Sequence, residues 1–135
     1  MTAEGSPNLG SRPAADCTHT VLLAEDEELL REITALVLRR AGYQVLEAAT
    51  TKAALAHYER GIDVLIADLG LPEVGGIRLF QELAKSHPEM KAVFISGYTQ
   101  ETASDVTQLP RGAAFLEKPF EHAALLQTIK RLLAD

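Results

Sequence analysis

The stretch that decides the fold runs Val64-Leu65-Ile66-Ala67-Asp68. Its first four residues are all apolar, which is typical of a central strand buried on both faces of a parallel sheet. An aspartate follows at once, where such a strand ends. Ligands of open parallel α/β sheets bind in the crevice at the carboxyl ends of the strands, so Asp68 is expected to lie at a functional edge.

Three other strings repeat this pattern of an apolar run followed by polar side chains. They are Val21-Leu22-Leu23-Ala24-Glu25-Asp26, Val93-Phe94-Ile95-Ser96 and Phe115-Leu116-Glu117-Lys118-Pro119. Parallel strands end at one edge, so Glu25, Asp26 and Asp68 should crowd together, facing Lys118 and the Ser96 hydroxyl. Like charges this close raise one another's pKa or require a cation. The pattern therefore predicts a divalent metal and an anionic ligand.

Strand and helix signals alternate five times along the chain, which predicts a parallel sheet covered by helices. We expect strands over 20–24, 44–48, 64–67, 92–95 and 114–117. The strand 44–48 has the half-buried alternation of an edge strand. Helices over 100–108 and 121–134 are expected to follow the fourth and fifth strands. The helix over 100–108 has the weakest apolar stripe.

The other helices are expected to follow the first three strands. In the first, Leu29, Leu30, Ile33, Leu36 and Val37 recur at helical spacing, and Gly42 stands where a C-cap glycine is favoured. The second is expected to begin after Thr50 or Thr51, to bury Tyr58 and to stop near residue 61. A third helix is expected to end before residue 88.

The polar residues at the strand ends have ordinary readings when each is taken alone. Asp68 could be a turn aspartate, Glu25 and Asp26 a solvated helix start, and Lys118 a surface cation. Taken together, these residues indicate a reactive site instead. Mg²⁺ takes one or two carboxylates plus waters and phosphate oxygens, while lysine and serine suit phosphoryl oxygens. The set predicts phosphoryl transfer by positioning and charge neutralisation.

Composition narrows the classes of protein further. The 135 residues fit one domain, with 47% hydrophobic and 24% charged residues. A net charge of −6 argues against a nucleic-acid partner. No apolar run reaches the roughly 20 residues that span a bilayer, and the N-terminus lacks signal-peptide features. We expect no membrane association, a cytoplasmic protein, and a disordered tail or linker over residues 1–18.

With these motifs in order, the chain resembles the receiver domain of two-component response regulators. The motifs are Glu25-Asp26, Asp68-x-x-Leu71-Pro72-x-x-x-Gly76, Ser96-Gly97 and Lys118-Pro119-Phe120. Methionine often stands at the position of Leu71 in the family. The resemblance covers nearly all of residues 19–135. It implies a flavodoxin-like (βα)5 fold whose five-stranded parallel sheet has the order 2-1-3-4-5.

The resemblance also implies roles for the strand-end residues. Asp68 would accept a phosphoryl group from the phosphohistidine of a histidine kinase or a histidine phosphotransfer protein. Asp26 would be the main Mg²⁺ ligand, with Glu25 acting through water and the Gly70 carbonyl completing the shell. Lys118 would pair with Asp68 before transfer and with a phosphoryl oxygen afterwards. The domain would catalyse its own phosphorylation and slow dephosphorylation without being a conventional turnover enzyme.

A switch is implied as well. Ser96 would move inward to the phosphoryl group, Phe115 would turn into the vacated space, and the face formed by helix four, strand five and helix five would shift. The same face would support a monomer or a weak dimer. The Lys118–Pro119 peptide is expected to be cis. Gly70 and Tyr98, each two residues beyond a site residue, leave the lifetime of the phosphorylated state open.

Three alternatives follow from the same residues. A haloacid-dehalogenase-type phosphatase also uses an aspartate nucleophile and Mg²⁺, but it has a second acid where this chain has Gly70. A receiver fold without chemistry would only dock partners. Among true receivers, the strings around Ser96 and Lys118 resemble receivers of hybrid sensor histidine kinases. A stand-alone regulator that acts by protein contact or phosphotransfer is the alternative.

Overall fold

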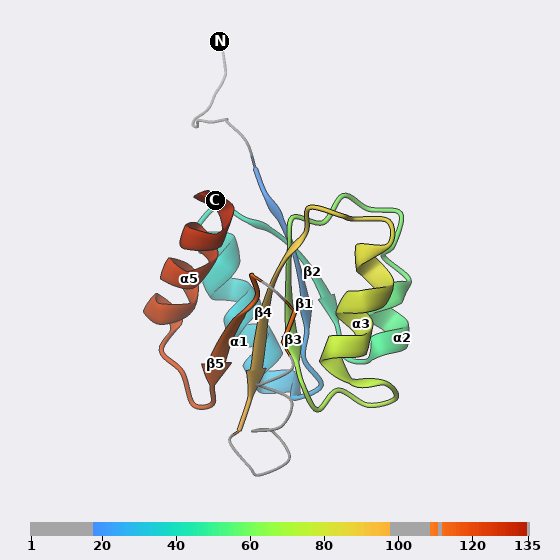
Figure 1. Ribbon diagram of the computed structural model, residues 1–135. Coiled ribbons are helices and arrows are strands. Elements are labelled where there is room, and N and C mark those ends of the chain that lie inside the picture. Colours follow the sequence, from blue (N-terminus) through green and yellow to red (C-terminus); the bar gives the residue numbers. More distant parts are fainter. Residues whose placement is uncertain (1–17, 98–108, 111, 135) are drawn as a thin grey trace.

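The protein folds into a parallel sheet between two layers of helices, here described in a computed structural model for residues 18–97, 109–110 and 112–134 (Figure 1). The elements are β1 (Thr20–Ala24), α1 (Glu28–Arg40), β2 (Gln44–Ala48), α2 (Thr51–Leu55), β3 (Val64–Asp68), α3 (Gly75–Ala84), β4 (Lys91–Ser96), β5 (Ala114–Glu117) and α5 (His122–Ala134). The strand order is β2-β1-β3-β4-β5, and all four pairings are parallel. The predicted order and fold class are confirmed.

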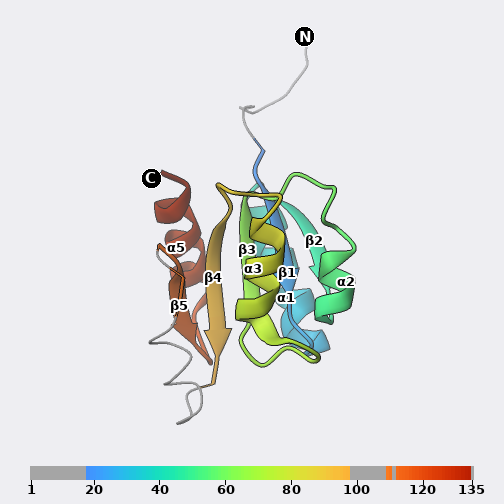
Figure 2. The same cartoon turned by 45° about the vertical axis from the view of Figure 1, so that its right-hand side comes forward.

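Each central strand supplies two separate cores, because successive side chains point to opposite faces of the sheet. Leu65 and Ala67 of β3 join the core under α2 and α3, whereas Val64 and Ile66 join the core under α1 and α5. Strand β3 is buried along its whole length, as its apolar run predicted. Figure 2 shows α1 and α5 on one side of the sheet and α2 and α3 on the other.

The ends of the first two helices follow local sequence signals. Gly42 comes just after the C-cap of α1 and has φ +103°, a conformation that glycine adopts without a steric penalty. The Thr50 side chain caps α2 by accepting a hydrogen bond from the Ala53 amide at 3.0 Å.

The expected length of the second helix is wrong. Helix α2 ends at Leu55, and Tyr58, predicted to be buried, is 55% exposed. The chain continues in tight turns in which the Tyr58 amide donates to the Leu55 carbonyl and the Arg60 amide to the His57 carbonyl. These turns take the place of further helix and leave the Tyr58 ring at the surface.

Part of the predicted apolar stripe of α1 faces outward. Leu29, Ile33 and Leu36 are 68%, 41% and 50% exposed. The fully buried residues of α1 are Thr34, Ala35 and Leu38, and Leu30 and Val37 are half-buried. The helical period predicted the element but only in part which of its residues are buried.

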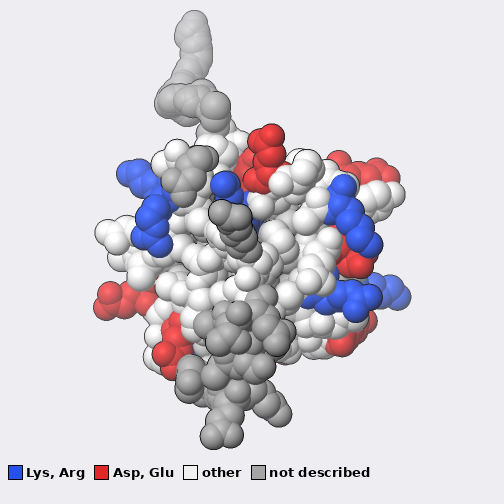
Figure 3. Space-filling model, viewed as in Figure 1, with Lys and Arg blue, Asp and Glu red and all other residues white. Residues whose placement is uncertain are grey.

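Two expectations fall on parts of the chain that are not described. The predicted helix over 100–108 and residues 1–17 of the expected tail lie outside the described residues. Within the described part, no helix has the length and apolar character needed to cross a bilayer. Acidic and basic side chains are interspersed on the face shown in Figure 3, and no continuous basic patch covers it.

Candidate functional site

The parallel register brings the polar ends of three strands to one edge of the sheet. Glu25 and Asp26 follow β1, Asp68 is the last residue of β3, and Lys118 follows β5. The start of α3 packs tightly against the end of β3: a Cβ added to Gly76 would lie 2.7 Å from the Asp68 carbonyl oxygen. Glycine at position 76 is therefore required for this close approach.

Three carboxylates lie close together at this edge. Glu25, Asp26 and Asp68 each offer one oxygen, and the three oxygens lie within 4.8 Å of one another. Glu25 is 1% exposed and Asp68 is 8% exposed, whereas Asp26 lies at the surface. Carboxylates this close and this buried repel one another unless a cation lies between them.

Lys118 is the cation that faces this cluster. Its Nζ lies 2.9 Å from Asp68 Oδ2, 3.1 Å from Glu25 Oε1 and 3.6 Å from Glu27 Oε1. The ammonium donates a hydrogen bond to Asp68. Glu25 Oε1 is buried, and the Lys118 ammonium at 3.1 Å is its charged partner among the described residues. A buried carboxylate oxygen with spare acceptor capacity favours a cation as a further partner.

The charge states of this pair follow from opposing effects. Burial raises the pKa of Glu25, helped by the nearby charge of Asp68, although the Glu27 amide and Lys118 oppose the shift. Burial alone would lower the pKa of Lys118, but its contacts with Asp68 and Glu25 outweigh burial and raise it. Lys118 is therefore positively charged throughout the physiological range.

The loop after β3 holds the other oxygen of Asp68. The Gly70 amide donates a hydrogen bond to Asp68 Oδ1 at 2.8 Å, and the Leu71 amide donates to the Asp68 carbonyl at 3.2 Å. Leu71 is buried and anchors the loop. The orientation of the Asp68 carboxylate is thus set by Lys118 on one oxygen and by this loop on the other.

The remaining predicted residues lie around the same edge. Ser96 ends β4, and its hydroxyl donates to the Gly97 carbonyl at 3.0 Å. Phe115 is half-buried in β5, in register with Phe94, and packs against the core under α3. The Lys118–Pro119 peptide is cis, as the resemblance implied. Tyr98 lies outside the described residues.

Sequence reasoning missed two side chains that contact the site. The exposed Glu27 reaches Lys118, and its place beside Glu25 and Asp26 in the acidic run was the available signal. Arg31 donates from Nη1 to the Glu25 carbonyl at 2.9 Å, and its Nε lies 3.6 Å from Glu47 Oε1 of β2. No short motif indicates this role, which depends on the packing of α1 against β2.

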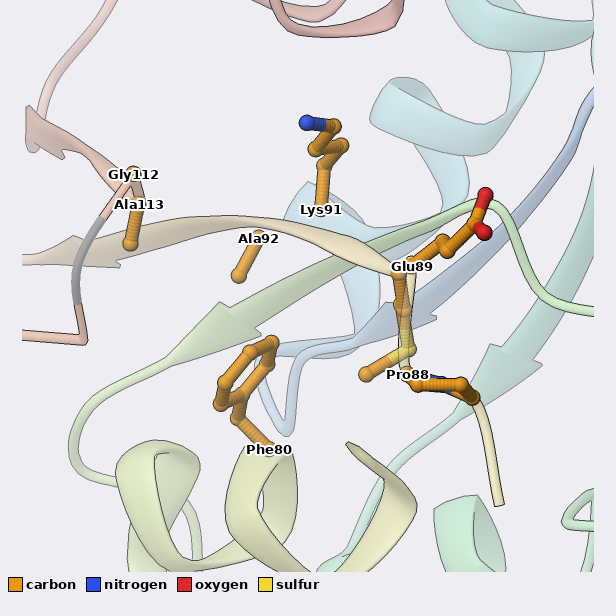
Figure 4. A pocket seen from close by; sticks show the side chains of 8 residues that line it. Phe80, Pro88, Glu89, Lys91, Ala92, Gly112 and Ala113 are labelled. Carbon is orange, nitrogen blue, oxygen red and sulfur yellow. The ribbon is translucent and has the colours of Figure 1, made fainter. Parts of the chain in front are cut away.

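A cavity of about 460 Å³ lies elsewhere, at the amino ends of β4 and β5 (Figure 4). Phe80 points from α3 toward β4 in this view, and its ring meets Phe94 edge-on at 6.0 Å. The described lining residues include neither Lys118 nor any carboxylate of the cluster. We place the candidate site by its chemistry, because the hollow of Figure 4 brings no reactive groups together.

The strand order and the flanking helices are those of a receiver domain. The sequence pattern of the response regulator receiver domain matches residues 21–130, and the chain belongs to this family. It is similar to the sensor kinase CckA of Brucella abortus strain 2308, with 39% identity over 119 residues, 84% of this chain and 12% of CckA. The chain therefore spans only a small part of that relative.

Two further relatives are matched over nearly their whole length. The response regulator receiver protein CpdR of the same Brucella strain is 31% identical over 114 residues, 84% of this chain and 95% of CpdR. The crystal structure of a CheY-like receiver domain protein from Methanospirillum hungatei JF-1 superposes with a TM-score of 0.77 and 29% identity, over 87% of this chain and 95% of that one.

Proposed function

We propose that this receiver domain accepts a phosphoryl group on Asp68 from the phosphohistidine of a histidine kinase or a histidine phosphotransfer protein. The observation that carries the proposal is the setting of Asp68. It is a nearly buried carboxylate at the end of the central strand, within 2.9 Å of a charged lysine and beside two further acids. A carboxylate with no catalytic task would not need this concentration of like charge.

Mg²⁺ fits the donor set. The three clustered carboxylates are hard oxygen ligands, and Glu25 Oε1 is a buried acceptor with spare capacity. Asp26 and Asp68 would hold the ion directly, Glu25 through water, and the Gly70 carbonyl would complete the protein's share. When bound, the ion would neutralise charge on the phosphoryl oxygens as the group is transferred.

The residues of this chain perform the rest of the step. An oxygen of Asp68 attacks the phosphorus, the phosphorus–nitrogen bond of the donor breaks, and its electron pair returns to the donor imidazole. Lys118 moves its hydrogen bond from Asp68 to a phosphoryl oxygen and keeps the added charge paired. Ser96 donates its hydroxyl to another phosphoryl oxygen. These contacts strengthen as charge builds up at the site.

The response to phosphorylation would involve Phe115 and the face that β5 and α5 form with the segment before β5. Inward movement of Ser96 frees space beside β5, which the half-buried Phe115 ring then fills. The two packings need to differ by only a few kcal/mol for one covalent group to select between them. The domain would act as a monomer or as a weak dimer through this face.

The surface beside the site suits a helical partner. The exposed stripe of Leu29, Ile33 and Leu36 runs along α1, which begins next to the acidic cluster. A hollow of about 410 Å³ lies between α1 and the segment after β5, lined by Glu27, Leu30, Lys118, Pro119, Phe120 and His122. An apolar helix face laid on this stripe would bring a histidine to Asp68.

The larger protein is proposed to be a hybrid sensor kinase. The 39% identity to the sensor kinase CckA favours this assignment. A stand-alone regulator is the second candidate, favoured by the match to CpdR over 95% of its length. Phosphotransfer profiling against purified kinases distinguishes them: a hybrid receiver takes phosphoryl groups fastest from its own kinase core, and a stand-alone regulator from a separate protein.

Intact-mass measurement tests the central proposal. Purified protein is incubated with acetyl phosphate and Mg²⁺, and we expect the mass of one phosphoryl group to be added. Asp68→Asn should gain nothing. Asp63→Asn is the matched control because Asp63 stands just before the amino end of β3, and it should react like the unmodified protein.

Two outcomes would overturn the proposal. Unmodified protein that stays unphosphorylated by acetyl phosphate and by a panel of kinases would indicate a docking module without chemistry. An equal mass gain in Asp68→Asn would show that another residue accepts the phosphoryl group. Chelation of Mg²⁺ should suppress the gain, and phosphorylation that persists without any divalent cation would contradict the metal assignment.

A further inference from the structure

The loop that holds Asp68 Oδ1 is fastened at its far end to α2. Glu73 lies three residues beyond Gly70, and its Oε1 accepts a hydrogen bond from the Thr51 hydroxyl at 2.6 Å and from the Lys52 amide at 2.9 Å. The Thr51 hydroxyl also lies 3.1 Å from the Pro72 carbonyl. One side chain of the loop is thus joined to two groups that are more than 20 residues away in sequence.

Two features mark this contact as more than a surface hydrogen bond. Thr51 is 1% exposed, so its hydroxyl has no access to bulk water and depends on the loop for a partner. Glu73 has φ +83°, a left-handed conformation that side chains other than glycine and asparagine rarely adopt. The two hydrogen bonds hold Glu73 in a conformation that it would not favour alone.

The path from Glu73 to the site is short. Pro72 and the buried Leu71 separate it from Gly70, whose amide orients Asp68 Oδ1. On the other side of Glu73, a Cβ on Gly75 would lie 3.1 Å from the Leu69 carbonyl. The loop is therefore anchored by the buried Leu71, while Glu73 itself is exposed, and only Pro72 and Leu71 separate a shift at position 73 from Gly70.

We propose that Glu73 and Thr51 form a latch that positions the β3–α3 loop, and with it the oxygens of Asp68 and Gly70, for Mg²⁺. Both are positioning residues, since they act through the loop. The inference rests on the proposed metal site, which it extends by assigning two residues outside it. Hydrogen-bonded supports of metal ligands are commonly needed for full affinity.

Paired variants separate the latch from general stability. Glu73→Asn suits the left-handed backbone but is one methylene too short to reach Thr51, whereas Glu73→Gln keeps an acceptor at full length. Thr51→Val removes the hydroxyl at nearly constant volume, whereas Thr51→Ser keeps it. Glu82→Gln is the charge-matched control, because Glu82 is an acid on α3 that pairs with Arg78 and Lys85.

Two readouts are needed. Amide hydrogen exchange of residues 69–71 in metal-free protein reports the order of the loop, and titration calorimetry with Mg²⁺ alone reports affinity. We expect Glu73→Asn and Thr51→Val to speed exchange and to weaken Mg²⁺ binding by about 10-fold, the lower end of the range for indirect supports. Glu73→Gln, Thr51→Ser and Glu82→Gln should resemble the unmodified protein.

The outcomes of the two proposals can be told apart. If the unmodified protein binds Mg²⁺ no better than Asp26→Asn does, the metal site fails, while the exchange data still test the latch. If the unmodified protein binds Mg²⁺ and both latch variants bind it equally well, the latch is overturned, even where exchange is faster. Weaker binding with equal protection in all five variants would also overturn it, because the effect would not pass through the loop.

Discussion

The two ends of the parallel sheet differ in how closely their acidic side chains are crowded together. At the amino end, Asp63 Oδ2 accepts a hydrogen bond from the Thr20 amide at 2.8 Å, and the His87 ring lies between the Leu83 and Arg60 carbonyls, at 3.0 and 2.6 Å. Both of these side chains are paired with the backbone. At the carboxyl end, Glu25, Asp26 and Asp68 lie close together, and Lys118 pairs with Glu25 and Asp68.

This difference distinguishes polar groups that hold the fold together from polar groups kept for chemistry. Pairing isolated polar groups with the backbone stabilises a structure. Crowded carboxylates cost stability and are expected where a site needs a cation or a charged ligand. We therefore expect substitutions at the amino end to change stability alone. Substitutions at the carboxyl end should change both stability and ligand binding.

The largest effect is expected for Lys118→Met. It leaves the carboxylate cluster without its cation, so the free energy of unfolding of metal-free protein should fall by about 2 kcal/mol, somewhat less than when a fully buried ion pair is broken, since the Lys118 side chain is 21% exposed. Urea denaturation measures it. Lys85→Met, which removes a surface pair with Glu82, should cost less than about 0.5 kcal/mol. Equal losses would contradict the special status of Lys118.

A smaller loss is expected at the amino end. Asp63→Ala removes the acceptor of the Thr20 amide and should lower the free energy of unfolding by about 1 kcal/mol. Mg²⁺ affinity and the rate of phosphorylation should stay unchanged in folded protein. A loss of Mg²⁺ binding in this variant would break the distinction between the two ends.

Asp26→Asn is expected to have the opposite sign. It removes one of three neighbouring like charges, so metal-free protein should melt about 2 °C higher while losing Mg²⁺ binding. Differential scanning calorimetry with and without Mg²⁺ measures both changes. A lower melting temperature without metal would mean that the acidic cluster does not repel itself.

The smallest effect concerns pH. The Thr51 hydroxyl, and after it the Lys52 amide, lower the pKa of Glu73 in the folded protein from its usual 4.5. A lowered folded pKa contributes stability that is present above pH 4.5 and is lost as pH falls through the folded value. The stability difference between unmodified protein and Glu73→Gln should therefore shrink on acidification below pH 4.5. A stability difference that grows on acidification would mean that the pKa of Glu73 is raised in the folded protein instead.

The sequence predicted the parts of the structure that repeat a local pattern. The apolar run 64–67 predicted a central strand, and the residues after the runs, Asp68 above all, were located because strand direction fixes one common edge. The alternation at 44–48 predicted the edge strand β2. These features depend on a period or on strand polarity, both of which can be read from a single segment.

Side-chain contacts that neither strand polarity nor a family motif indicates were not predicted. Thr34 and Ala35 lie against the sheet, and no single-helix pattern indicates that Leu29 and Ile33 are left outside. The hydrogen bond between Glu73 and Thr51 joins residues 22 apart in sequence. Such contacts arise only when α2 and the loop after β3 meet in three dimensions.

The sheet also divides the interior into two compartments that do not share side chains. A substitution under α3 and one under α5 are separated by the backbone of the strands, so their energetic effects should add, and each compartment can drift in evolution without forcing change in the other. A one-residue deletion within β3 is the exception. It would exchange the contents of both compartments at once, so this strand should tolerate replacement far better than a change of length.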